Sequence, residues 1–139
     1  MDKVVDRIYV GDNLDPHELR VSNSEQIGAI LNVCETFDPA LDVASLHMPF
    51  ADCAPIPTYE FQTCMSWLEQ QYRRSDRNIF IHCHLGISRS PTICASFMFL
   101  QKISPTIQEA LATIKAARPI INPHPLTLQS AITYLEEMK

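Results

Sequence analysis

A nearly unbroken apolar stretch at residues 90–101 is the feature that most constrains how this chain folds. A helix that is apolar on all sides must be buried, so this stretch predicts a helix at the centre of the molecule. A β-branched run at residues 79–81 precedes it, and only a short loop containing Gly86 separates the two. Such a run is typical of a strand that is buried on both faces. We therefore expect a buried strand that leads through the loop into a central helix.

The remaining elements are predicted from periodicity and from residues that begin helices. Short apolar runs predict strands at residues 8–10, 29–33, 46–48 and 79–81. One helix is expected to begin with Asp15 as an acidic N-cap followed by Pro16, and another at a cap formed by Ser104. Apolar side chains at helical spacing predict two more helices, over residues 61–72 and 128–135. Together these elements predict an α/β fold with a small central, mostly parallel sheet flanked by helices.

Composition narrows the class of protein. A chain of 139 residues with 46% hydrophobic and 19% charged residues fits a single domain over residues 1–139. Its net charge of −5 and its lack of basic clusters disfavour nucleic acid or a membrane surface as a partner. The N-terminal residues lack the apolar core of a signal peptide, and no apolar run is long enough to span a bilayer. We expect a cytoplasmic monomer.

Five cysteines, Cys34, Cys53, Cys64, Cys83 and Cys94, are spread along the chain. Their odd number and the absence of any CxxC pair indicate neither a disulfide framework nor a structural zinc site. Reduced thiols are expected, and each is either a core side chain or a reactive group.

The loop between the predicted strand and the central helix carries the residues for a nucleophilic reaction. Cys83 ends the strand, and Arg89 follows six residues later at the start of the helix. A strand, a short loop and a helix N-terminus turn backbone N–H groups inward and form an anion site, which would also stabilise a thiolate at Cys83. Arg89 offers a planar fork for two phosphate oxygens, and the Ser90 hydroxyl can assist departure of the sulfur.

This pattern, Cys-x5-Arg preceded by His82 and followed by Ser90, resembles the signature of protein tyrosine phosphatases, and residues 83–92 look like the dual-specificity branch. Residues 7–11, 30–33 and 118–123 are similar to other characteristic stretches of that branch. The resemblance implies a protein tyrosine phosphatase-like fold that needs no cofactor. Its implied phosphate-binding loop comprises His84, Leu85, Gly86, Ile87, Ser88 and Arg89. His124 departs from the pattern, because it stands where the family usually has the Asn that anchors one loop.

A general acid is required on a separate segment, because an alkoxide is a poor leaving group. The family places this Asp on a loop about thirty residues before the Cys, and Asp52 lies 31 residues before Cys83. The implied mechanism has two steps. Cys83 attacks phosphorus while Asp52 donates a proton, and water then hydrolyses the phosphocysteine with Asp52 as base and Ser90 assisting release.

The two histidines on either side of Cys83 have further expected roles. His82 is expected to orient the loop through hydrogen bonds and His84 to shape the rim of the pocket. A metal site is disfavoured, because adjacent residues of an extended chain point to opposite sides and no second ligand pair is present.

Cys34 is either a buried thiol or, as the resemblance to phosphatase-and-tensin-type enzymes implies, a redox partner that forms a disulfide with Cys83.

Several functions use such a loop, and the residues favour one of them. A phosphorylated protein is preferred as the substrate and partner, with phosphotyrosine and also phosphoserine and phosphothreonine accepted. A phosphoinositide phosphatase is disfavoured because residues 84–88 include no lysine, and an RNA 5′-phosphatase because the chain is acidic. A phosphate-recognising module without turnover would use the same loop, as would sulfurtransferase or arsenate-reductase chemistry.

Overall fold

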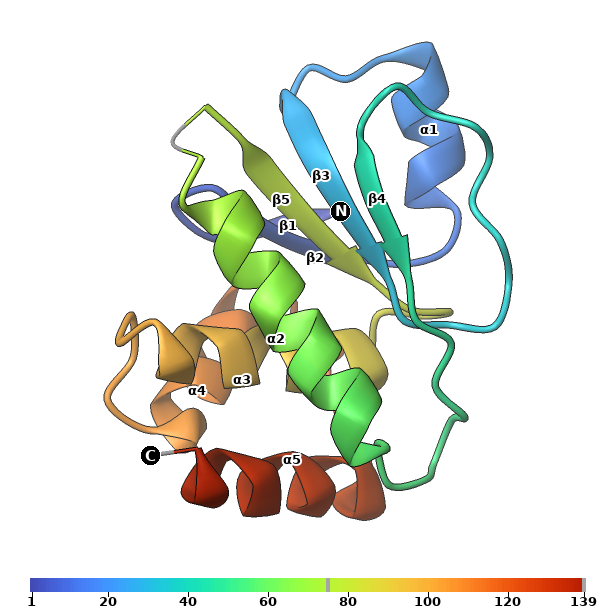
Figure 1. Cartoon of the computed structure of the whole chain (residues 1–139). Coiled ribbons are helices and arrows are strands. Elements are labelled where there is room, and N and C mark those ends of the chain that lie inside the picture. Colours follow the sequence, from blue (N-terminus) through green and yellow to red (C-terminus); the bar gives the residue numbers. More distant parts are fainter. Residues whose placement is uncertain (75, 139) are drawn as a thin grey trace.

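The computed structural model describes residues 1–74 and 76–138, in which five strands form one sheet (Figure 1). The sheet order is β1-β2-β5-β3-β4, with β5 in the centre. The strands are β1 (Asp2–Val5), β2 (Ile8–Gly11), β3 (Ile27–Asn32), β4 (Ala44–His47) and β5 (Asn78–His82). The helices are α1 (Asp15–Val21), α2 (Thr58–Tyr72), α3 (Arg89–Leu100), α4 (Ile107–Ala117) and α5 (Pro125–Glu137).

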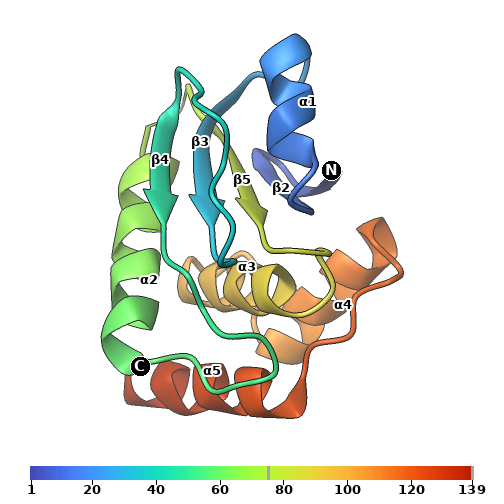
Figure 2. The ribbon, with the colours of Figure 1, turned by 90° about the vertical axis from the view of Figure 1, so that its right-hand side faces the viewer.

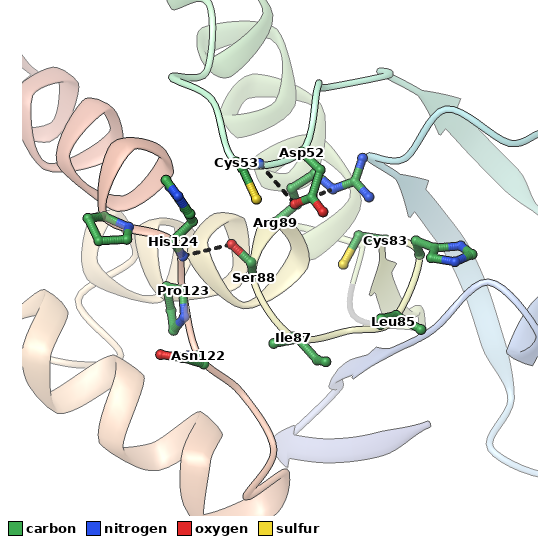
Figure 3. Close-up of a pocket in the computed structure, with 12 residues that line it drawn as sticks. Asp52, Cys53, Cys83, Leu85, Ile87, Ser88, Arg89, Asn122, Pro123 and His124 are labelled. Atoms are coloured by element: carbon green, nitrogen blue, oxygen red, sulfur yellow. Dashed lines mark hydrogen bonds and ion pairs between the residues drawn. The ribbon is translucent and has the colours of Figure 1, made fainter.

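The sheet is parallel except at one edge. β2 and β3 each pair in parallel with β5, and β4 pairs in parallel with β3, whereas β1 runs antiparallel to β2. The carboxyl ends of the four parallel strands therefore lie at the same edge of the sheet, where open α/β sheets hold their ligands. Cys83 directly follows β5 at this edge, next to the cavity shown in Figure 3. The predicted α/β fold with a mostly parallel sheet is confirmed.

The two faces of the sheet are covered by different helices. α1 lies on one side of the sheet and α2 on the other (Figure 2). Alternate residues of β5 follow this division, because Ile79 and Ile81 belong to the large core beneath α2 and α3, whereas Phe80 packs with Leu19 of α1. A strand with side chains buried on both faces reads as a continuous apolar run, as the sequence predicted for residues 79–81.

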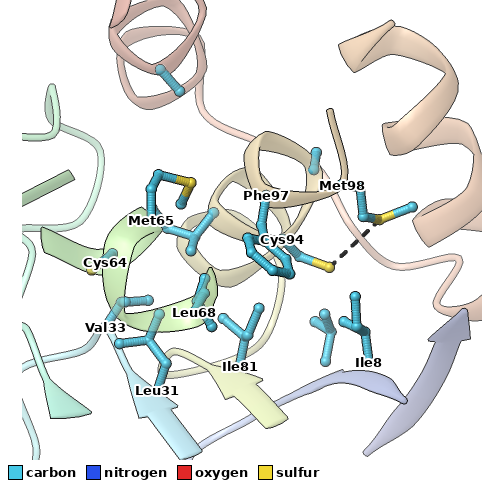
Figure 4. Close-up of a cluster of buried hydrophobic side chains, with 14 of the residues drawn as sticks. Ile8, Leu31, Val33, Cys64, Met65, Leu68, Ile81, Cys94, Phe97 and Met98 are labelled. Atoms are coloured by element: carbon cyan, nitrogen blue, oxygen red, sulfur yellow. Dashed lines mark hydrogen bonds between the residues drawn. The ribbon is translucent and has the colours of Figure 1, made fainter. Parts of the chain in front are cut away.

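Helix α3 is the centre of the larger core. Every residue from Arg89 to Met98 is buried, and Phe97 packs edge to face against Tyr72 of α2 with ring centroids 5.5 Å apart. Figure 4 shows Cys94, Phe97 and Met98 of this helix facing side chains from α2 and the sheet. The all-round apolar stretch is therefore buried as predicted, and it holds the start of α3 in a fixed place beneath the edge of the sheet.

The structure corrects two predicted helix caps and adds one strand. Asp15 is the first residue of α1 rather than its cap, and the Asp12 carboxylate accepts the backbone N–H groups of Leu14 and Asp15 instead. The cap of α4 is Thr106, not Ser104, since the Thr106 hydroxyl accepts the N–H of Glu109 at 3.1 Å. Strand β1 was not predicted, because a polar, half-buried edge strand carries little periodicity.

Within the described residues, no helix combines the length and apolar character needed to cross a membrane.

Candidate active site

The segment between β5 and α3 forms the floor of a cavity of about 440 Å³ at the carboxyl edge of the sheet (Figure 3). Cys83 is 3% exposed at its base. The cavity is lined by Asp52, Cys53, Cys83, His84, Leu85, Ile87, Ser88, Arg89, Asn122, Pro123, His124 and Pro125. All of the residues that the sequence predicted for the nucleophile, the acid and the arginine therefore line one cavity.

The carbonyl groups of residues 83–87 all contact partners outside the loop. The His84 carbonyl accepts the N–H of Asn13, and the Ile87 carbonyl accepts the N–H of Asn122 at 2.7 Å. The Cys83 carbonyl lies 3.2 Å from Nδ1 of His82. Carbonyls of the two remaining residues, Leu85 and Gly86, accept from a single arginine.

A trans peptide places the C=O of one residue and the N–H of the next on opposite sides. The N–H groups of residues 84–88 therefore point toward the cavity, and none of them donates a hydrogen bond within the described part of the chain. Five such N–H groups lie next to the N-terminus of α3, which adds its own partial positive charge. Together they form a site for an oxyanion.

Arg118 is the arginine that holds the loop, and sequence reasoning did not assign it to the site. Its Nε donates to the Gly86 carbonyl and its Nη2 to the Leu85 carbonyl, both at 2.9 Å, while Nη1 pairs with Asp2 at 2.8 Å. Gly86 has a φ of +69° and lies so close to Arg118 that only glycine fits there. The Arg118-Pro119 pair was visible in the sequence, but nothing local indicates its partners.

The Cys83 thiol has one polar side chain in contact with it. Sγ lies 3.2 Å from Oγ of Ser90, and Ser90 is fully buried in the first turn of α3. The structure therefore brings Ser90 to the sulfur, as the sequence predicted. A hydroxyl at this distance can donate a hydrogen bond to a thiolate and stabilise it.

Arg89 is buried and held by groups from two other loops. Its Nη1 donates to the carbonyl of Phe50 at 2.8 Å and forms an ion pair with Glu35. Nε lies 3.7 Å from Oδ1 of Asp52. Because Nη1 is occupied on the outer side, Nε and Nη2 form the edge that remains for a phosphate. Glu35 was missed, although an acidic residue just beyond β3 at the same edge of the sheet was a possible signal.

Asp52 lies on the loop between β4 and α2, above Cys83 and next to Arg89 (Figure 3). Its side chain is 56% exposed, and Oδ1 accepts the N–H of Cys53 at 3.0 Å. A carboxyl on this side of the cavity faces the position that the leaving oxygen of a bound phosphate ester would take, opposite the sulfur.

A buried polar network lies behind the loop, around His82. Nε2 of His82 lies 2.9 Å from Oδ1 of Asp38. The two groups form an ion pair, but the angles at Nε2 do not fit a regular hydrogen bond. Burial by itself lowers the pKa of His82, but the Asp38 carboxylate, the neighbouring Cys34 thiol and the Cys83 carbonyl together raise the pKa to about 9. His82 is therefore a cation at neutral pH, and it fixes the Cys83 carbonyl away from the cavity.

Cys34 belongs to this network. Its Sγ lies 3.0 Å from Oδ1 of Asn32 and 3.2 Å from Oγ1 of Thr36. Burial alone would raise the pKa of the Cys34 thiol, but contact with protonated His82 and with Thr36 lowers it below the ordinary value of a cysteine. The residue is 1% exposed and lies just beyond β3, where Val33 donates its N–H to the carbonyl of His82. Cys34 and Cys83 therefore follow adjacent strands at the same edge.

His124, at the position of the expected Asn, contacts the loop through its backbone and the start of α5 through its side chain. Its backbone N–H donates to Oγ of Ser88 at 2.9 Å, and its Nδ1 accepts the N–H of Leu126 at the start of α5. A histidine can thus cap the helix through Nδ1 as an Asn side chain would through its oxygen. Among the described residues, no cluster of His, Cys, Asp and Glu is arranged to hold a metal ion.

Comparisons with known proteins point to one family. The sequence model described as "Dual specificity phosphatase, catalytic domain" matches residues 8–136. Human dual specificity protein phosphatase 15 is 32% identical over 124 residues, which cover 88% of this chain and 41% of that protein. The mouse protein of the same name is 32% identical over 127 residues, covering 90% of this chain and 53% of that protein. The chain thus spans about half the length of these relatives or less.

Solved structures agree with the sequence comparisons. The crystal structure of DUSP15 superposes with a TM-score of 0.79 at 30% identity, covering 98% of this chain and 85% of that one. The crystal structure of human DUSP28 gives a TM-score of 0.84 at 20% identity, covering 99% and 97% of the two chains, and this likeness concerns the fold alone.

Replacement of Gly86 by alanine tests how tightly the loop is held. A Cβ on Gly86 would lie 2.6 Å from the Gly11 carbonyl oxygen and 2.7 Å from Nη2 of Arg118, so Gly86→Ala should cost about 1–3 kcal/mol of stability and at least tenfold in affinity for tungstate. Gly28→Ala is the matched control, because its Cβ would meet nothing closer than Cγ of Arg77 at 3.4 Å. Chemical denaturation and tungstate titration measure the two effects, and equal behaviour of both variants would contradict the close fit.

The pKa of His82 predicts how stability depends on pH. This pKa is raised from 6.5 to about 9 in the folded state, so its contribution is complete below pH 6.5 and is lost as the pH rises through 9. Asp38→Asn removes the main partner of the cation and should flatten this loss, whereas the exposed Asp42→Asn should not. Denaturant unfolding between pH 6 and 9.5 measures the slopes. A slope in Asp38→Asn as steep as in the wild type would contradict the assignment.

Proposed function

The chain belongs to the dual specificity phosphatase family, and from that premise we propose that it hydrolyses phosphate monoesters of proteins through a phosphocysteine on Cys83. Phosphotyrosine, phosphoserine and phosphothreonine are the proposed substrates. One observation carries the proposal: the N–H groups of residues 84–88 converge on a cavity whose floor is the Cys83 thiol. An oxyanion bound by them would bring its central atom in front of the sulfur.

The first step transfers the phosphoryl group to the enzyme. The Cys83 thiolate attacks phosphorus and forms the S–P bond as the P–O bond to the substrate breaks. Nε and Nη2 of Arg89, together with the loop N–H groups, hold the three nonbridging oxygens. Asp52 donates its proton to the departing oxygen, which leaves as a neutral hydroxyl group.

The second step returns the enzyme to its starting state. Asp52, now ionised, takes a proton from water as the water attacks the phosphocysteine, and inorganic phosphate is released. The sulfur leaves as a thiolate, and the Ser90 hydroxyl 3.2 Å away donates a hydrogen bond to it. The chain's own side chains account for each proton and each bond in this cycle.

Observations at the cavity also favour a protein substrate over an inositol phosphate or a nucleotide. Residues 84–88 and the other lining residues include no lysine that could meet the extra phosphates of such molecules. A module that binds without turnover would not need a carboxyl above the sulfur, and Asp52 lies there. We further propose that residues 1–139 act as one catalytic domain and that it is a cytoplasmic monomer.

Replacement of Asp52 tests the assignment of the general acid. Asp52→Asn should lower kcat for phosphoserine and phosphothreonine peptides by about 10²–10⁴-fold, because their leaving groups are alkoxides. For p-nitrophenyl phosphate, whose leaving group needs no proton, the loss should be much smaller. Steady-state kinetics on both substrates measure the difference, with Asp42→Asn as the control at an exposed carboxylate. Cys83→Ser should abolish both activities. Equal losses on the two substrates would refute the role of Asp52, and an inactive wild type would refute the enzyme.

We also propose that Cys34 protects Cys83 during oxidation. Peroxide would convert the Cys83 thiolate to a sulfenic acid with release of hydroxide. The Cys34 thiol would then attack that sulfur and form a disulfide with release of water. The position of both residues just beyond adjacent strands, and the lowered pKa of Cys34, support this proposal.

Mass spectrometry after mild peroxide treatment tests the disulfide. The wild type should yield a peptide that links Cys34 to Cys83, and a reductant should restore activity. Cys34→Ser should instead accumulate sulfinic or sulfonic acid at Cys83. Cys53→Ser is the control, because Cys53 also lines the cavity but is exposed. Sulfonic acid at Cys83 in the wild type, with no link to Cys34, would exclude the pairing.

A further inference from the structure

The charges around the cavity are unequally distributed for a site that binds an anion. Arg89 is the only lysine or arginine among the lining residues. Glu35 pairs with Nη1, and Asp52, which must be protonated to act as the general acid, lies 3.7 Å from Nε. Glu35 therefore already balances the charge of this single cation before a substrate binds.

Three other basic side chains are engaged or lie away from the cavity. Arg118 is buried beneath the loop and pairs with Asp2. Arg7 donates to the carbonyls of Tyr72, Arg74 and Arg77, near the amino end of β5 and hence at the opposite edge of the sheet. Lys102 follows the C-terminal end of α3, whereas the cavity lies at the N-terminal end of that helix. None of these three side chains lines the cavity.

Glu35 has the position to act on a substrate beyond the phosphate. Its side chain is 64% exposed, and only Oε1 is used by Arg89, so Oε2 faces solvent. Asp52 is similarly 56% exposed. The wall around Leu85, Ile87 and Pro123 is uncharged. The chain neighbours of a phosphorylated residue in the cavity would thus lie near the exposed Glu35 carboxylate, and exposed charges act over about a Debye length, about 8 Å in physiological salt.

We infer that this enzyme selects singly phosphorylated protein segments that carry lysine or arginine close to the phosphorylated residue, and that Glu35 determines this selection. The inference rests on the proposed function. A bound phosphate is stabilised by the loop N–H groups and Arg89, but a second phosphate or a flanking Asp or Glu is repelled by the exposed Glu35 carboxylate. A flanking cation is attracted by the same carboxylate.

Matched phosphotyrosine peptides test the selection. Four versions differ only at the residue directly after the phosphotyrosine, which is Arg, Ala, Glu or phosphoserine. Each change of one charge at an exposed site should alter kcat/KM by about two- to fivefold, so the Arg peptide should exceed the Glu peptide by about tenfold and the doubly phosphorylated peptide by more. High salt should compress the series, because it screens exposed charges.

The Glu35→Gln variant assigns the effect to one residue. Its amide oxygen can still accept from Arg89, so the variant should keep a measurable kcat while the ratio between the Arg and Glu peptides falls by about threefold. Asp42→Asn is the control, because Asp42 is exposed on the same connection between β3 and β4 but lines a different hollow, beside α1. Its ratio should equal that of the wild type.

The outcomes separate the inference from the proposed function. Equal kcat/KM for all four peptides, with good turnover, would overturn the charge selection and leave the phosphatase activity in place. A wild-type ratio that persists in Glu35→Gln would overturn the role of Glu35. No turnover of any peptide or of p-nitrophenyl phosphate would overturn the proposed function and, with it, the inference.

Discussion

The bidentate contact of Arg118 with the carbonyls of Leu85 and Gly86 is the interaction on which the rest of the site depends. Peptide planes that face outward on one side must present their N–H groups on the other, so an arginine outside the loop sets the direction of N–H groups inside it. Those N–H groups then have no hydrogen-bond acceptor within the described part of the protein. The resulting loss of folding free energy must be offset by contacts elsewhere. Arg118 supplies such contacts, and Asp2 in turn neutralises its buried charge.

The nucleophile of the site lies on buried, rigid elements, whereas its two carboxyl groups lie on exposed connections. Cys83 and Ser90 lie at the junction of the central strand β5 and the buried helix α3, so their positions are fixed by the two best-packed elements of the core. Asp52 and Glu35 lie on connections at the carboxyl edge of the sheet and are largely exposed. A nucleophile needs fixed geometry, whereas an acid and a selecting carboxylate must reach substrates of different shape, and this division of elements serves both needs.

Sequence reasoning succeeded where the relevant contacts are local. The strand at residues 79–81, the loop and the helix that starts near Ser90 are adjacent in the chain, and their periodicity is strong enough to predict the fold class and the meeting of Cys83, Arg89 and Ser90. Asp52 was found only because the resemblance supplied its distance from Cys83. Arg118 and Glu35 were missed because their partners lie 32 to 116 positions away in the chain, and no local pattern indicates such pairs. The caps of α1 and α4 were misplaced by one or two residues, since the N-caps are Leu14 and Thr106, because several neighbouring residues can begin a helix.

The central claim is that the converging N–H groups serve a thiolate nucleophile at Cys83. Rapid quenching of p-nitrophenyl phosphate turnover in acid, followed by mass spectrometry of the peptide that contains Cys83, tests it most directly. The account predicts a phosphoryl group on the Cys83 sulfur, formed at the rate of the initial burst of p-nitrophenolate release. A burst without that adduct, or a phosphoryl group bound to a different residue, would contradict it.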